Sequence, residues 1–185
     1  MSFGKRKRIK IDKKVACVFF FLHLLCMVAP FQINWGAFSI CLALFMITGL
    51  FGITISYHRN LSHKSFKIPK WLEYLFAYCG VHALQCVRTV MLLHVTFMVN
   101  SLCHLWGKQP WKTNDFSRNN WWMSLVAFGE GWHNNHHAFE YSARMGIEWW
   151  QFDLGWYVIV FLQAIGVATN VKSPSQSHKQ KLAKR

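Results

Sequence analysis

The longest pattern along the chain is an uncharged, mostly apolar run from Val15 to Tyr57. One transmembrane helix needs only ~20 such residues, so this run is long enough for two spans. Pro30 and the polar residues after it interrupt the run near its middle. The pattern predicts a helical hairpin in a membrane, with spans over about 15–30 and 36–57.

A second apolar region runs from Trp71 to Trp106 and contains few charges. Residues 71–85 are short for a span, whereas residues 86–106 are enough for one. Our hypothesis is that 71–85 lies on the membrane or re-enters it. The whole region then returns to the side from which it started, with no net crossing.

Basic residues are concentrated at the two ends of this pattern. The net charge of +14 accompanies 53% hydrophobic and 17% aromatic residues. Because basic flanks mark the cytosolic side of membrane proteins and attract anionic lipid, we assign the charge to the membrane and not to nucleic acid. We expect an all-α integral membrane protein with a basic cytosolic tail over 1–14, one domain over 15–170, and a disordered basic tail over 171–185.

Histidines supply the candidate chemistry. The segment Gly129–His137 reads GEGWHNNHH and places His133, His136 and His137 at positions i, i+3 and i+4. These positions share one face of an α-helix. Neutral imidazole is the commonest protein ligand of transition metals, so the spacing predicts a face of three metal-binding nitrogens. The alternative is a solvated polar face, which three histidines within five residues argue against.

Two further pairs lie where apolar runs end. His58 and His63 follow the second predicted span, and a spacing of five puts them roughly 140° apart on a straight α-helix. The span is therefore expected to end near His58. Asn100 and His104 stand at i and i+4 near the end of the third predicted span, a pairing that suits a metal ligand and a neighbour that holds a water molecule.

Six histidines could together hold iron at a lipid–water boundary: His58, His63, His104, His133, His136 and His137. Iron held by imidazole can activate O₂ to break an unactivated C–H bond, which no side chain does without a metal or cofactor. The chemistry to expect is O₂ activation by a metal close to lipid.

Three segments resemble the motifs of a known family: Ser56–His63, Asn100–Gly107 and Gly129–Phe139. They are similar to the first histidine box, the Asn-and-His segment and the third box of the membrane fatty acid desaturases, of the acyl-CoA Δ9 type in their plant acyl-lipid branch. The resemblance implies a four-span helical fold with a cytosolic histidine-box cap. It implies two Fe²⁺ ions held by the six histidines, with Asn100 orienting a metal-bound water. The implied reaction introduces a cis double bond into a saturated acyl chain while O₂ is reduced to water.

The family's second box, of the form HxxHH, has no counterpart in this chain. The chain resembles the family up to Gln85 and continues at Cys86 with what resembles the family's last span. We expect a truncated version of the fold, with six histidines for the about twelve ligand positions of two octahedral irons. Three functions stay open: an acyl desaturase, a non-catalytic desaturase remnant or partner subunit, and a histidine-box membrane hydroxylase.

The resemblance also implies partners and a location. The substrate would be acyl-CoA or the acyl chain of a membrane lipid, and a b-type cytochrome or a ferredoxin would supply electrons. Pairing with full-length desaturases is a further expectation, and no nucleic-acid partner is expected. We expect the endoplasmic reticulum membrane, with a plastid membrane as the alternative.

Overall fold

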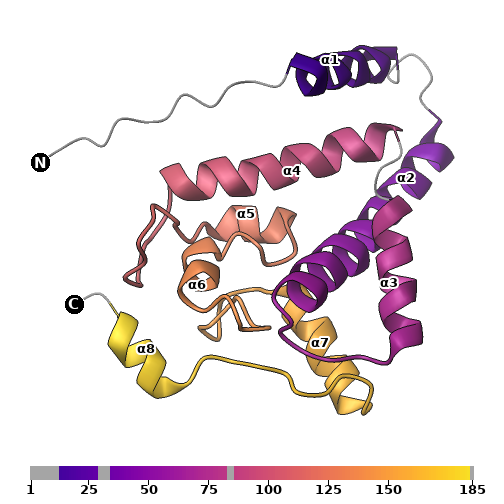
Figure 1. The fold of residues 1–185 in the computed structure, drawn as a ribbon. Helices are drawn as coiled ribbons and strands as arrows, with labels where there is room; N and C mark the ends of the chain where they lie inside the picture. Colours follow the sequence, from indigo (N-terminus) through magenta and orange to yellow (C-terminus); the bar gives the residue numbers. More distant parts are fainter. Residues whose placement is uncertain (1–12, 29–33, 83–85, 184–185) are drawn as a thin grey trace, which may run out of the picture.

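The computed structural model describes residues 13–28, 34–82 and 86–183. Over these residues the chain is helical, with isolated β-bridges and no strand, as the all-α expectation requires. The helices in chain order are α1 (Lys13–Val28), α2 (Trp35–Ile47), η2 (Thr48–Ser62), α3 (Lys70–His82), α4 (Cys86–Leu105), α5 (Trp121–Val126), α6 (His133–Ala138), α7 (Leu154–Ala164) and α8 (Gln176–Leu182). Figure 1 shows their arrangement.

Helices α2 and η2 follow one another without a break. Within the described residues, Phe38–Ser62 is the one helix that is long and apolar enough to cross a bilayer, by length and composition. A helix that is apolar all round is suited to lipid and not to water. The exposed large apolar side chains of α2 are Trp35, Phe38, Ile40, Leu42, Leu44, Met46 and Ile47.

The other two predicted spans correspond to α1 and α4. Helix α1 has 16 residues, fewer than the ~20 of a full span, and residues 29–30 of its predicted range lie outside the described residues. Helix α4 has 20 residues, but polar side chains such as His94 and Asn100 lie along it. The described part of the chain therefore has one candidate span, where the sequence predicts three and the family resemblance implies four.

The second span does not end near His58, so that expectation is wrong. Helix η2 continues to Ser62 in a π-helical register, in which the amide of residue i+5 donates to the carbonyl of residue i. The amide of His63 donates to the carbonyl of His58 at 3.1 Å. A spacing of five residues closes about one turn in this register. His58 and His63 therefore face the same way without a break in the backbone between them.

Helix α3 packs alongside η2 (Figure 1). The two backbones approach so closely that a Cβ on Gly52 would clash with the backbone of Gly80. The hydroxyl of Tyr57 closes this contact by donating to the carbonyl of Ala77 at 2.9 Å. Residues 70–82 thus lie beside the candidate span.

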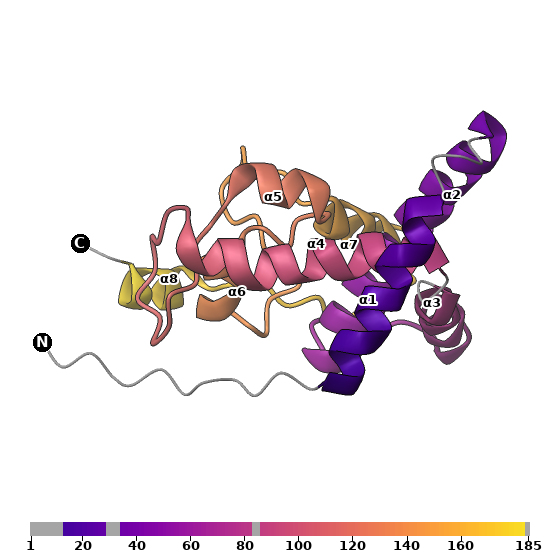
Figure 2. The same ribbon diagram turned by 90° about the horizontal axis from the view of Figure 1, so that it is seen from above.

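Helix α4 lies over α5 and α6, and α1 lies across α4 (Figure 2). A small buried cluster of Val99, Cys103 and Met123 joins α4 to α5. The C-terminal end of α4 carries His104 to α6, and the C-terminal end of η2 carries His58 to the same short helix. This meeting of the two ends is the arrangement that the hypothesis of no net crossing over 71–106 requires.

The C-terminal segment has structure where the sequence predicts a disordered tail. Helix α8 begins after Ser175, whose hydroxyl accepts a hydrogen bond from the amide of His178 at 3.2 Å. Such an N-cap offsets the cost of the unpaired amides in the first turn. The end of α8 then pairs with the loop before α5, because the amide of Lys112 donates to the carbonyl of Leu182 at 2.7 Å.

Candidate metal centre

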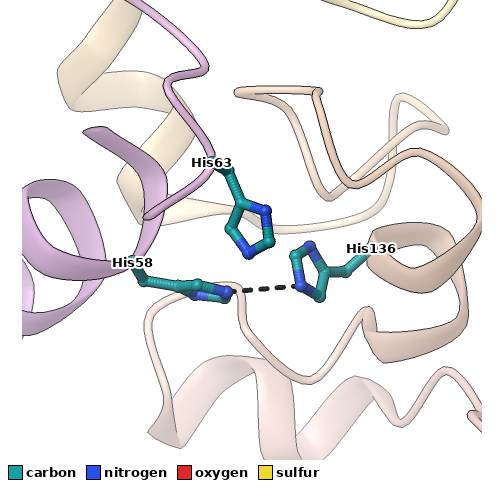
Figure 3. A group of neighbouring side chains, drawn as sticks. All are labelled: His58, His63 and His136. Atoms are coloured by element: carbon teal, nitrogen blue, oxygen red, sulfur yellow. Dashed lines mark hydrogen bonds between the residues drawn. The ribbon is translucent and has the colours of Figure 1, made fainter. Parts of the chain in front are cut away.

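The histidines after the candidate span meet one histidine of α6. His58, His63 and His136 form a group in which each residue offers a ring nitrogen within 4.8 Å of the others. The three rings point toward one another, His58 from η2, His63 from the residue after it and His136 from α6 (Figure 3). The Nε2 atoms of His58 and His136 are 3.3 Å apart. We call these three residues the His58 group.

The other two histidines of α6 meet the end of α4. His104, His133 and His137 form a second group of the same kind, which we call the His104 group. Its nitrogens converge on His133, whose Nε2 lies 3.0 Å from that of His104 and 3.1 Å from that of His137. All six histidines singled out in the sequence are therefore brought together, three in each group, with α6 contributing to both.

The spacing of these nitrogens suits a metal ion. Two imidazole nitrogens that each lie ~2.1 Å from a metal are ~3.0 Å apart at a right angle and ~3.4 Å apart at a tetrahedral angle. The observed separations of 3.0, 3.1 and 3.3 Å fall within these limits. A neutral imidazole has one N–H donor and one acceptor, so the Nε2 of His133 cannot satisfy two facing nitrogens by ordinary hydrogen bonds. A shared cation would satisfy all three.

A carboxylate orients one imidazole in each group. The Nδ1 of His58 lies 2.6 Å from Glu130, and the Nδ1 of His137 lies 2.6 Å from Asp115. When Nδ1 carries the proton and donates it to a carboxylate, Nε2 keeps its lone pair for a metal. Metal-binding histidines almost always have such a partner on their second nitrogen.

The Glu130 carboxylate belongs to a buried network of charges. Arg59 is fully buried and contacts Glu130 at 3.4 Å and Asp153 at 2.8 Å. Asp153 also accepts hydrogen bonds from the amides of Met145 and Trp156. The second bond caps the first turn of α7 (Leu154–Ala164). The network is tight, because a Cβ on Gly129 would clash with the Asp153 carboxylate. Removing Arg59 leaves Asp153 without a cationic partner, and removing either carboxylate leaves Arg59 with one partner instead of two.

The Asp115 carboxylate lies on the loop between α4 and α5 and is held by neutral donors. The hydroxyls of Ser117 and Thr113 donate to it at 2.5 and 2.9 Å. The side-chain amide of Asn134 donates to the same two hydroxyls at 3.2 Å each. Helix α6 therefore fixes the loop that in turn orients His137.

Burial and neighbouring charge set the ionisation of these groups. Burial and the charge of nearby His137 lower the pKa of His133 to about 3. Burial and His58 lower the pKa of His136 well below its ordinary value. Burial acts to raise the pKa of Glu130, but the positive charges of His58 and Arg59 outweigh it and lower the pKa to about 2. The two deeply buried imidazoles are thus neutral at pH 7, which is the form that binds metals.

A cavity of about 280 Å³ lies beside both groups. Its polar lining includes His58, Glu130, His133, His136, His137 and Asn100. The rest of the lining is mainly apolar and includes Ile53, Leu92, Val95, Val99 and Phe128 from η2, α4 and the segment after α5. Asn100, which the sequence predicts to hold a water molecule, thus lines the same cavity as four of the six histidines.

Sequence reasoning missed the carboxylates and the arginine. Glu130 lies inside the GEGWHNNHH segment, and Arg59 follows His58 directly, so both were within the motifs and were not assigned a role. Asp115 and Asp153 lie in loop segments without any repeating pattern. Only the folded arrangement places these two beside His137 and Arg59.

Comparison with characterised proteins finds several similar plant desaturases, although no protein-family model matches the chain. A palmitoyl-monogalactosyldiacylglycerol delta-7 desaturase, chloroplastic, of Arabidopsis thaliana is 41% identical over 94% of this chain and 72% of its own length. The delta-9 acyl-lipid desaturase 1 of the same plant is 38% identical over 97% and 88%. An acyl-CoA C20 delta5-desaturase of Anemone leveillei is 36% identical over 88% and 82%.

These alignments are longer than the chain itself. The first extends over 267 positions, whereas the chain has 185 residues. The relative therefore contains residues within the aligned region that have no counterpart here. This agrees with the sequence observation that a segment of the family pattern is missing.

Proposed function

We propose that this chain, which belongs to the fatty acid desaturase family, is itself a catalyst of acyl desaturation. The proposed reaction removes two hydrogens from a saturated acyl chain and forms a cis double bond. O₂ is reduced to two waters with two electrons from a donor and two protons. The observation that carries the proposal is the placement of two three-histidine groups beside one largely apolar cavity.

In this proposal each group holds one iron ion. His58, His63 and His136 would hold one, and His104, His133 and His137 the other, with Asn100 holding a metal-bound water. Bound iron would supply the electron transfer and O₂ activation that side chains lack. The separation of the imidazole nitrogens and the carboxylate on one Nδ1 in each group support this assignment.

The residues of this chain have three tasks in the reaction. Glu130 and Asp115 orient imidazoles so that their Nε2 lone pairs face the metal positions. The apolar wall of the cavity holds the acyl chain by burying its methylenes, each worth about 0.8 kcal/mol. The same wall excludes water from the acyl chain next to the histidines, which protects a reactive site from side reactions.

The membrane, the electron donor and the location follow from the same proposal. The Phe38–Ser62 helix would cross the membrane, so that the acyl chain enters from lipid or as acyl-CoA. A b-type cytochrome or a ferredoxin would supply the electrons. We propose the endoplasmic reticulum membrane, with a plastid membrane as the alternative, which the chloroplastic name of one relative supports.

A non-catalytic function is the second candidate, because the relatives contain aligned residues that this chain lacks. Three imidazoles for each iron leave about three octahedral positions for water or for another chain. The chain would then be a desaturase remnant or a partner of a full-length desaturase. A hydroxylase is the third candidate and differs from the first only in its product.

Expression in a host that lacks its own desaturase tests these candidates. We expect about two irons for each purified chain and new unsaturated acyl chains in the host lipid. Hydroxylated acyl chains would favour the hydroxylase. Bound iron without any product would favour the non-catalytic function, and a chain that binds no iron would contradict the proposal. The variant His133→Ala, in the same host, should bind about one iron and form no product.

A further inference from the structure

The C-terminal helix closes over the loop that carries Asp115. Trp111 forms an isolated antiparallel bridge with Ala183, and the amide of Lys112 donates to the carbonyl of Leu182. These contacts join residues 182–183 to Trp111 and Lys112 of the loop, four and three residues before Asp115. We call residues 176–183 the C-terminal strap.

His178 anchors the strap to the chain that follows α6. Its ring stacks on Tyr141 with an angle of 4° between the planes, and the two groups share a hydrogen bond of 3.0 Å between the Tyr141 hydroxyl and Nδ1. The edge of the same ring meets Phe139, with centroids 5.1 Å apart. Phe139 directly follows α6 and is almost completely buried.

Trp111 connects the strap to α6 itself. Its ring contacts Phe139 with centroids 5.0 Å apart. Its indole N–H donates to the side chain of Asn135 at 2.8 Å, and its amide donates to the side chain of Asn134 at 2.9 Å. Asn134 and Asn135 lie directly after His133 in the helix that carries three of the ligand histidines.

These contacts form one path from the strap to the His104 group. The strap contacts Trp111, and Trp111 fixes this part of the loop against α6. The same loop carries Asp115, which orients His137. The carboxylate that orients the His58 group has a separate support. Glu130 is paired with Arg59, which Asp153 holds from the start of α7, and the described contacts of these three charges include none with α8.

We propose that the C-terminal strap positions the His104 group for metal binding, with His178 as its anchoring residue. This inference rests on the proposed function, because it assumes that the group binds a metal. His178 does not touch the metal position and acts through Trp111, Phe139 and the loop. The strap is therefore linked to the orienting carboxylate of the His104 group and not to that of the His58 group, so we expect it to act on one metal position.

The test compares His178→Ala with Lys181→Ala, an exposed residue of the same helix. Each purified full-length chain is stripped of metal in detergent and titrated with Co²⁺, whose visible absorption reports imidazole binding. We expect the parent chain and Lys181→Ala to bind two Co²⁺ ions. His178→Ala should bind one ion as the parent does and the other at least about tenfold more weakly, as is usual when a ligand loses its orienting partner.

Two backgrounds assign the weakened position. With His58→Ala present, only the His104 group remains intact, and His178→Ala should weaken the remaining binding. With His104→Ala present, His178→Ala should have no effect. Equal weakening in both backgrounds, or unchanged binding in both, would overturn the positioning role.

Hydrogen exchange separates this inference from the proposed function. Without metal, the amide of Lys112 should exchange at least about tenfold faster in His178→Ala than in Lys181→Ala, because its acceptor on the strap is released. Unchanged exchange would show that the strap does not hold the loop. If the parent chain binds no Co²⁺ while the exchange changes as expected, the proposed function and the positioning role fail, and the strap remains only a structural element.

Discussion

The His58 group and the His104 group share α6, but the carboxylates that orient them are held in opposite ways. Glu130 is almost buried and is paired with a fully buried arginine, which a second buried carboxylate also contacts. Asp115 is 35% exposed, lies on a loop, and is held by the hydroxyls of Thr113 and Ser117. One group thus depends on a charged network inside the protein, and the other depends on a loop that neutral hydrogen bonds keep in place.

This difference determines how strongly each group is tied to the stability of the fold. A buried charge whose partner is removed has no water to replace it, so breaking the network around Arg59 should strongly destabilise the fold. Hydrogen bonds from hydroxyls to a carboxylate contribute about 1.5–3 kcal/mol each, less than breaking a buried ion pair, so the loop can be weakened without loss of the fold. The His58 group is therefore tied to global stability, and the His104 group can be altered locally.

The largest expected effect comes from breaking the buried network. Asp153→Ala removes the 2.8 Å partner of Arg59, the N-cap of α7 and acceptors for the amides of Met145 and Gly146. We expect a loss of about 3–5 kcal/mol in the free energy of unfolding, measured by denaturant titration in detergent.

The control for this change is Lys70→Ala, which breaks the exposed pair between Lys70 and Glu73. Exposed ion pairs contribute little, so no measurable change in stability is expected. Similar losses in the two variants would mean that the Arg59 network has no special role in the fold.

Lowering the pH should reduce the stability of the metal-free protein through a buried histidine in each group. The pKa values of His133 and His136 are lowered in the folded chain, so below the ordinary pKa of 6.5 the unfolded chain binds protons that the folded chain does not. The free energy of unfolding of the metal-free protein should therefore fall as the pH is lowered from 7 to 5, by on the order of 2 kcal/mol from His133 alone. Glu130 adds nothing in this window, because the stability from its lowered pKa is lost only between its ordinary pKa of 4.5 and about 2.

Stability measured at several pH values in the parent and in His133→Gln checks this expectation. The variant has no imidazole to protonate at that position, so its stability should change less over the same range. An equal change in the two proteins would show that protonation of His133 does not oppose folding.

A matched pair of substitutions tests the two carboxylates directly. Glu130→Gln and Asp115→Asn each remove one orienting charge while keeping the size of the side chain. We expect Glu130→Gln to weaken Co²⁺ binding at the His58 group about 10–100-fold, and Asp115→Asn to do the same at the His104 group toward the lower end of that range. The amide oxygen introduced by Asp115→Asn can still accept hydrogen bonds from Thr113 and Ser117, whereas Glu130→Gln leaves Arg59 with one carboxylate fewer.

Co²⁺ titrations in the His104→Ala and His58→Ala backgrounds measure each position separately. The comparison between the groups fails if either substitution weakens both positions equally. The proposed difference between the groups is also wrong if Asp115→Asn weakens Co²⁺ binding at the His104 group more than Glu130→Gln weakens it at the His58 group.

The smallest expected effect is confined to the loop. Ser117→Ala removes a hydroxyl that donates to Asp115 and accepts from Asn134. We expect a loss of about 1.5 kcal/mol in stability, the low end for a hydrogen bond to a charged group because Asp115 is partly exposed, and weaker Co²⁺ binding at the His104 group alone. Ser101→Ala is the control, because the Ser101 hydroxyl donates only within its own helix, to the carbonyl of Phe97. A change at the His58 group in Ser117→Ala would show that the loop is not independent of the buried network.

Local patterns in the sequence were enough to find the six candidate ligands. His133, His136 and His137 lie on one helical face because their spacing matches the α-helical period. The apolar run before His58 is long enough to predict a membrane helix, and the structure has its one candidate span there, in the part of the chain that it describes. The helical fold class follows from the same runs.

The sequence did not determine the register between His58 and His63, because an α-helix was assumed and a π-helix is rare. Residues 176–182 were expected to be disordered, although Ser175 is a good N-cap and Gln, Lys and Leu favour helices. Contacts with Tyr141, Trp111 and Phe139 hold this helix against the rest of the chain. The π-helical register at His58 is thus a structure that the folded chain adopts against local preference, whereas the C-terminal helix has local signals that were not used.

The sequence by itself determined which side chains can bind a metal and which stretches are apolar enough for lipid, because spacing and hydropathy are properties of neighbouring residues. Tertiary structure alone decided how the six histidines divide into two groups of three. It also decided that Glu130 and Asp115 orient them, and that Arg59 and Asp153 support only one of the groups. These are contacts between residues far apart in the chain, and no local pattern encodes the folded path that brings such residues within hydrogen-bonding distance.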